Sequence, residues 1–209
     1  MQTNDDMNCK HCGNTLANDT KLCHTCGKPV EGEKLERDTP DIEYFSIPLR
    51  RLAFLSVLTL GLYEIFWFYK NWQAIKSAEG QKIYPFWRAI FAVFFCYGLF
   101  KKVLESAKSH NYRESFSPGG LAAVYICILL VSSGMSKIES YDIGFNILWL
   151  VITVTTFIPL LSVQKAINFN NEKLKGDNVL KPGFSGGEVT LIVIGVIWFI
   201  LVLIGTFLP

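Results

Sequence analysis

The chain has 209 residues, half of them hydrophobic, and a formal net charge of only +2. So small a charge does not suggest a nucleic-acid-binding protein, and 16 phenylalanines suit a lipid environment better than a soluble core. The apolar residues are segregated, because no aromatic residue precedes Tyr44 whereas most of the chain after residue 48 is hydrophobic. Residues 1–6 lack the basic and apolar regions of a cleaved signal peptide, so we expect the N-terminal part to stay in the cytoplasm.

Four cysteines near the N-terminus form two Cys-x-x-Cys pairs, Cys9 with Cys12 and Cys23 with Cys26. Four thiolates can complete the tetrahedral shell of a structural zinc site, and a reducing cytoplasm disfavours disulfides between them. A glycine follows each pair, where the chain must turn with little steric hindrance. We therefore predict a zinc ribbon over residues 1–28, with zinc as cofactor and these four cysteines as ligands. The module resembles the short zinc ribbons at the N-termini of many bacterial membrane proteins.

Other interpretations of this module are weaker. A redox dithiol needs a βαβ framework around one Cys-x-x-Cys pair, and the module is too small to contain one. His11 and His24 lie inside the two pairs and could replace a cysteine ligand, although exposed turn residues would explain them as well. The lysines of the module are matched by aspartates, and it has no aromatic side chain for base stacking. We therefore expect the ribbon to contact a protein and no nucleic acid.

Residues 29–47 form a predicted flexible linker. Charged residues are dense there, two prolines interrupt the run, and apolar residues are few. This composition is typical of a solvated spacer. The linker would connect the ribbon to a helical membrane domain over residues 48–209.

Five hydrophobic segments follow, over residues 52–69, 86–100, 121–135, 145–163 and 189–208. At ~1.5 Å per residue the last two reach about 28–30 Å, enough to cross the bilayer core. The second and third are short unless flanking residues extend them, and Pro159 should kink the fourth. The predicted fold is mainly α: a polytopic helical membrane domain with three clear spans, the last three segments, and two shorter or re-entrant segments.

The first segment also carries a family signature. Residues 59–72 read Thr-Leu-Gly-Leu-Tyr-Glu-Ile-Phe-Trp-Phe-Tyr-Lys-Asn-Trp. This run resembles the signature of a bacterial membrane-protein family of unknown function, which reads Gly-Ile-Tyr-x-Ile-Tyr-Trp-aromatic-Tyr-Lys. Leu62 and Phe66 depart from it conservatively. The resemblance covers roughly residues 50–105 and implies a membrane location without implying a reaction.

The basic residues indicate how the segments are oriented. Lys137 is the one basic residue between the third and fourth segments, whereas several lie between the fourth and fifth. The last three segments therefore run from inside to outside, back, and outside again. Five plain crossings from a cytoplasmic N-terminus would place the basic loop after the first segment outside. A first pair of segments that re-enters, with a turn near Gly61, fits the charge rule better, provided that protein covers the turn.

Glu64 is an acid inside the first apolar segment, and an intramembrane acid is by default a candidate functional residue. We expect Arg88 or a nearby lysine to be its partner. The alternative is that Glu64 lies at headgroup depth, where its carboxylate would be solvated. Trp67, Trp72 and Trp87 fit an aromatic belt at the membrane interface.

The sequence contains no nucleophile elbow, phosphate loop or His-Glu metal motif, so we do not expect an enzyme. The favoured interpretation is an integral protein of the bacterial inner membrane whose cytoplasmic zinc ribbon is a structural, protein-interaction or sensing module. One alternative is a channel- or transporter-like pathway for an ion or small molecule, centred on Glu64. A weaker alternative is a lipid-interacting protein that shapes the bilayer.

Overall fold

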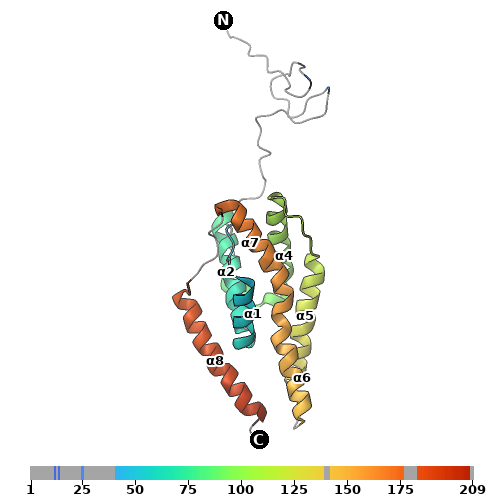
Figure 1. Ribbon diagram of the computed structural model, residues 1–209, viewed down its shortest axis with the longest axis vertical. Helices are drawn as coiled ribbons and strands as arrows, with labels where there is room; N and C mark the ends of the chain where they lie inside the picture. The colour runs from blue at the N-terminus through green and yellow to red at the C-terminus, as the bar shows by residue number, and fades with distance from the viewer. Residues whose placement is uncertain are drawn as a thin grey trace. The chain divides into compact units, whose positions relative to one another are not determined.

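A computed structural model describes residues 41–138, 142–176 and 183–207, together with Cys12, Asn14 and Thr25. The chain divides into two compact units, residues 1–40 and residues 41–209. The described part of the second unit is helical and contains no strand, as the sequence predicts (Figure 1). Apart from the three positions named above, the predicted zinc ribbon and most of the predicted linker lie outside the described residues.

The second unit contains eight α-helices in its described residues and one short 3₁₀ helix. They are α1 (Leu49–Leu58), α2 (Leu62–Glu79), α3 (Pro85–Ile90), α4 (Ala92–Ser109), α5 (Pro118–Met135), α6 (Ile143–Val154), η1 (Thr155–Phe157), α7 (Ile158–Lys175) and α8 (Gly186–Phe207). By length and composition, three helical stretches in the described residues could cross a membrane: α5, the continuous rod of α6, η1 and α7, and most of α8. They coincide with the three predicted spans.

Local sequence sets several helix ends. Ser117 caps α5 by accepting a hydrogen bond from the Gly120 amide at 3.1 Å, and Asp142 caps α6 by accepting one from the Phe145 amide at 2.7 Å. Where a kink is predicted at Pro159, the rod contains η1, which ends at Phe157, two residues before this proline. Proline has no amide hydrogen to donate to the preceding turn, so the α-helical pattern is interrupted there.

The first apolar segment is two helices, because α1 ends at Leu58 and α2 begins at Leu62. Between them Leu60 and Gly61 adopt positive φ angles of 47° and 86°, a conformation that glycine tolerates without steric cost. The chain then returns along α2, since Asn71 of α2 accepts a hydrogen bond from the Phe45 amide, which precedes α1. At ~1.5 Å per residue α1 is about 15 Å long, half the thickness of a bilayer core. The turn of this α1–α2 hairpin lies where the sequence predicted one.

The segment before α1 differs from its prediction as flexible linker. Ile42, Tyr44 and Ile47 are almost completely buried. The Asn171 side chain accepts a hydrogen bond from the Tyr44 amide at 3.1 Å and donates one to the Tyr44 carbonyl at 2.6 Å, as a neighbouring strand would. Further backbone bonds come from the amide side chains of Asn71, Gln164, Asn168 and Asn170. Residues 41–47 are therefore anchored between α2 and α7.

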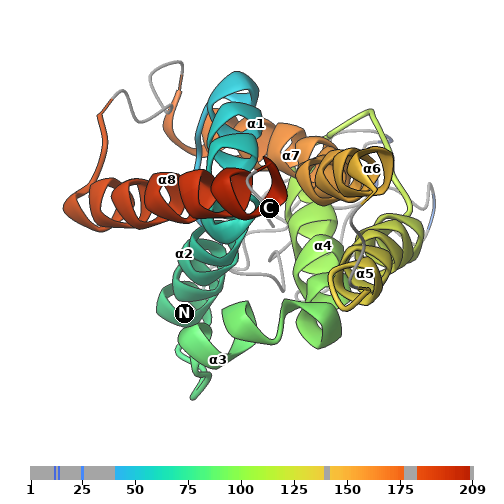
Figure 2. The same ribbon diagram turned by 90° about the horizontal axis from the view of Figure 1, so that it is seen from below.

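The α2 helix forms the centre of the core. Trp67 and Trp72 are buried against neighbouring helices, and the Trp67 indole donates a hydrogen bond to the Gln164 side chain on α7. The predicted interfacial belt is therefore wrong for these two residues, and only Trp87 of the three is exposed. Seen from below, α8 passes across the α1–α2 hairpin and its C-terminal end approaches α6, while α5 lies farther from α8 (Figure 2).

Candidate functional site

Glu64 lies in the first turn of α2, and only 2% of its surface is exposed. The Thr156 hydroxyl of η1 donates a hydrogen bond to Glu64 Oε1 at 2.6 Å, and Tyr125 of α5 also hydrogen-bonds the carboxyl. Gly61, whose φ is 86°, lies beside this site, because its ideal Cβ position is 3.6 Å from the Thr156 hydroxyl oxygen. The carboxyl is thus enclosed by the α1–α2 hairpin, by α5 and by the interruption in the long rod.

The structure does not bring Glu64 and Arg88 together, so the expected pairing is wrong. The Arg88 guanidinium lies over the Trp72 ring, 4.4 Å from its centroid, and 5.3 Å from the centroid of Phe95. Glu64 is bonded by hydroxyl groups, and its side chain is buried in protein rather than solvated as the alternative supposed.

Burial controls the protonation of Glu64, which lies outside the three candidate spans. Desolvation raises the pKa of this carboxyl from its ordinary value to about 7, although the hydrogen bonds from Thr156 and Tyr125 oppose the shift. Both the protonated and the ionised form are therefore accessible near neutral pH. A carboxyl of this kind can take up and release a proton.

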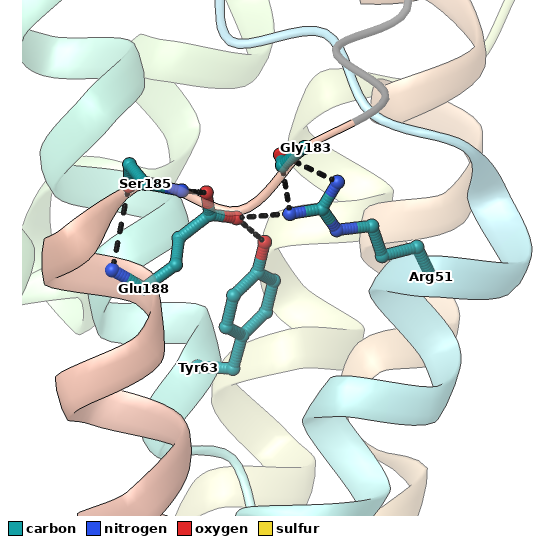
Figure 3. Close-up of polar contacts among 5 residues, drawn as sticks. All are labelled: Arg51, Tyr63, Gly183, Ser185 and Glu188. Carbon is teal, nitrogen blue, oxygen red and sulfur yellow. Dashed lines mark hydrogen bonds and ion pairs between the residues drawn. The ribbon is translucent and has the colours of Figure 1, made fainter.

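A second polar cluster joins the start of α8 to the hairpin (Figure 3). Glu188 Oε1 accepts hydrogen bonds from Arg51 Nη2 and from the Tyr63 hydroxyl, both at 2.9 Å. Glu188 Oε2 accepts from the amide of Ser185 at 2.9 Å and from its hydroxyl at 3.1 Å. Both terminal nitrogens of Arg51 also donate to the Gly183 carbonyl at 3.1 Å. This Arg51–Glu188 cluster therefore links α1, α2 and the first turn of α8.

The Arg51–Glu188 pair is an ion pair with little exposure to solvent. The side chains are 12% and 3% exposed, respectively, and the guanidinium also lies 3.9 Å over the Phe184 ring. Burial and the Glu188 charge both raise the pKa of Tyr63, so its hydroxyl stays protonated and donates. Breaking such a pair leaves a buried charge uncompensated, which is strongly destabilising.

This cluster does not follow from the hydrophobic segments, because Arg51 and Glu188 lie just outside the first and the fifth of them. One signal was present. Ser185-Gly-Gly-Glu188 has the spacing of a capping box, in which a serine and a glutamate satisfy each other's backbone amides. The structure contains these reciprocal contacts, with the Glu188 amide 3.4 Å from the Ser185 hydroxyl.

Farther along α8, Gly195 packs against the turn of the hairpin. A Cβ at Gly195 would lie only 2.4 Å from Thr59 Cγ2, so glycine is what permits this approach. Thr59 is itself fixed, since its hydroxyl donates to the Leu55 carbonyl and accepts from the Tyr63 amide. Gly195 is close to the midpoint of the candidate span Gly186–Gly205. The hairpin turn therefore lies about halfway along α8.

The predicted zinc site lies largely outside the described residues. Cys12 is described and exposed, and the other three predicted ligands are not described. Asn14 Nδ2 donates a hydrogen bond to Thr25 Oγ1 at 2.8 Å, which places a residue after the first cysteine pair beside a residue within the second. In the described part of the chain, no group of three His, Cys, Asp or Glu side chains could hold a metal ion.

No family model matches this chain, and neither a curated protein nor a solved structure matches it. The resemblance of residues 59–72 to a bacterial membrane-protein family therefore stays a prediction.

Proposed function

We propose that this protein is an integral protein of the bacterial inner membrane with a cytoplasmic zinc ribbon that binds a protein partner or senses a signal. The ribbon has no catalytic role and binds no nucleic acid. The three apolar helices support the membrane location. So do the large exposed hydrophobic side chains of α8, such as Ile194, Trp198 and Leu201, which form a surface suited to lipid rather than water.

In this proposal α5, the rod of α6, η1 and α7, and α8 cross the membrane, and the α1–α2 hairpin enters from the cytoplasm and returns. The shortness of α1 supports this topology. A chain turn inside a bilayer must be covered by protein, and Thr156 and Gly195, both in candidate spans, contact the hairpin near its turn.

The segment that leads from the N-terminal unit meets the polar ends of two helices. Asp41 Oδ1 lies 3.7 Å from the imidazole of His110, which follows α4, and Glu43 bonds Lys175, the last residue of α7, at 2.6 Å. Lysines and arginines are frequent near these helix ends, as expected on the cytoplasmic side. The N-terminal unit would then also be cytoplasmic.

The observation that carries the proposal is the way residues 41–47 are anchored. Their backbone is bonded by amide side chains, and they lead directly into α1. On α1, Arg51 bonds Glu188 and so holds the start of α8. The second unit is thus tied together from its first residues, and the N-terminal unit is attached at that point. A small module attached to a stable membrane domain suits the recruitment of a partner.

Co-purification from membranes tests the proposal. The full chain should contain one zinc and retain a partner protein, whereas a chain that lacks residues 1–28 should lose both. Cys23→Ser is a control of matched length, which should lose the zinc and the partner but leave the membrane domain inserted. Full zinc retention after removal of all four cysteines, or equal partner binding by the truncated chain, would contradict the proposal.

A second candidate function is a pathway for protons or small cations centred on Glu64. It is favoured by the burial of this carboxyl among hydroxyl groups, beside the interrupted rod. Glu64→Gln should then abolish proton flux in proteoliposomes that contain a pH-sensitive dye. The exposed Glu105 provides a matched control, because Glu105→Gln should leave the flux unchanged. Equal flux in the wild type and Glu64→Gln would exclude this pathway.

A further inference from the structure

An apolar groove of about 430 Å³ lies between α2 and α8. Leu62 and Ile65 line it on α2, and Gly187, Thr190, Leu191 and Ile194 line it on α8. At ~1.5 Å per residue the α8 side is about 10 Å long, which fits within one leaflet of a bilayer core. Ile65 and Ile194 are exposed on the outside of the unit. The groove is therefore open to the surroundings of the protein along its length.

A lysine lies near one end of this groove. Gly187 is the first α8 residue that lines the groove. It lies close to Phe66, because a Cβ at Gly187 would be 3.6 Å from the Phe66 ring. The Lys70 ammonium lies over the same ring, 5.5 Å from its centroid. Leu62, Phe66 and Lys70 are spaced four residues apart, so they stand above one another on one face of α2. The Lys70 ammonium thus lies just beyond the end of the groove at which α8 begins.

The start of α8 does not add to this charge, because the Glu188 carboxylate already lies in its first turn and accepts from the Ser185 amide, while the Ser185 hydroxyl accepts from the Glu188 amide. Among the described residues, three carboxylates lie in this region. Glu188 bonds Arg51 and Glu43 bonds Lys175, while Asp41, which lines a surface pocket together with Glu43 and Lys70, lies 3.7 Å from the His110 imidazole. The Lys70 ammonium therefore suits an anionic group, and the apolar lining of the groove suits a hydrocarbon chain.

We propose that the α2–α8 groove binds an anionic phospholipid, with an acyl chain along the groove and the phosphate beside Lys70. The charge at one end and the apolar lining below it match the two parts of this ligand. A lipid in this place would also fill the space between the hairpin and α8. The lipid site is independent of the zinc ribbon, because none of its residues precedes residue 41.

Native mass spectrometry of the full-length protein can test the site, with dioleoyl phosphatidylglycerol and dioleoyl phosphatidylethanolamine as probes. The wild type should bind the first phosphatidylglycerol more tightly than the first phosphatidylethanolamine. Lys70→Ala should weaken phosphatidylglycerol binding about fivefold, the effect of one cation near an anionic lipid. It should weaken phosphatidylethanolamine binding less, because the ammonium of that headgroup offsets the charge of its phosphate. Lys76→Ala is the control on α2, and it should change neither affinity.

The groove itself is tested on α8. Thr190→Trp should fill it and weaken binding of both lipids, whereas Val193→Trp, on an exposed position outside the lining, should not. Equal lipid binding by the wild type, Lys70→Ala and Thr190→Trp would mean annular lipid only and would overturn the proposal. Competition by soluble glycerol phosphate at the same concentration as the lipid would overturn it too, because the groove would then contribute nothing.

Discussion

The contact between α8 and the hairpin turn can be tested with a single methyl group. In Gly195→Ala the new Cβ would lie 2.4 Å from Thr59 Cγ2, 2.5 Å from Thr59 Cβ and 3.1 Å from Thr59 Cα. Ordinary contacts of this kind begin near 3.4 Å, so α8 and the hairpin would have to separate by about 1 Å. Thr59 cannot turn away, because its backbone is part of the contact and its hydroxyl bonds Leu55 and Tyr63.

Gly205 is the matched control on the same helix, since a Cβ there would have no neighbour within 4 Å. Both substitutions gain about 1 kcal/mol of helix propensity. Only Gly195→Ala also bears the cost of overpacking, about 1–3 kcal/mol. Because a chain of this size loses about 2–4 °C of Tm per kcal/mol, Gly195→Ala should melt about 2–12 °C below Gly205→Ala.

The buried thiol of Cys96 on α4 can report the melt. In a variant whose other five cysteines are serine, a thiol-reactive dye should react only as the helical unit unfolds. The wild-type background and both alanine variants are then heated in the same detergent. A melting temperature of Gly195→Ala equal to or above that of Gly205→Ala would refute the close packing of α8 on the hairpin turn.

Three other predictions concern charge and topology. Glu188→Gln should lower the free energy of unfolding by about 3 kcal/mol, because the Arg51 charge loses its counter-charge. Changing both Arg51 and Glu188 to Met should restore most of the lost stability. A double variant as unstable as the single one would contradict the ion pair. The pKa of Glu64, raised to about 7 in the folded protein, makes the folded state bind this proton more tightly than the unfolded chain does. The free energy of unfolding should therefore fall by about 3 kcal/mol as the pH rises from about 4.5 to about 7. Glu64→Gln should remove this pH dependence from thermal melts. The same pH dependence in Glu64→Gln and the wild type would contradict the raised pKa of Glu64. For the topology, Ser77→Cys should resist an impermeant thiol reagent applied from the periplasm, whereas Ser136→Cys should react; labelling at Ser77 would restore five plain crossings.

Much of the helical architecture follows from the sequence, because its causes are local. Long apolar runs predict helices of membrane-spanning length wherever they occur, and the three spans fall where hydrophobicity places them. A glycine in the middle of the first run predicts a turn, and Gly61 adopts the positive φ that makes one. The Cys-x-x-Cys spacing likewise predicts a zinc site by itself, since the ligands of such a site are close neighbours in sequence.

The tertiary structure decided how these elements meet. Residues 41–47 have the composition of a linker, but Asn171, 127 positions after Tyr44, bonds the Tyr44 backbone and fixes the segment. Trp67 and Trp72 resemble an interfacial belt, yet the helices around α2 bury both. Glu64 was identified from sequence, but its partners were not. Hydrogen bonds, ion pairs and burial between distant residues depend on which helix faces come together, and neither composition nor spacing along the chain records that.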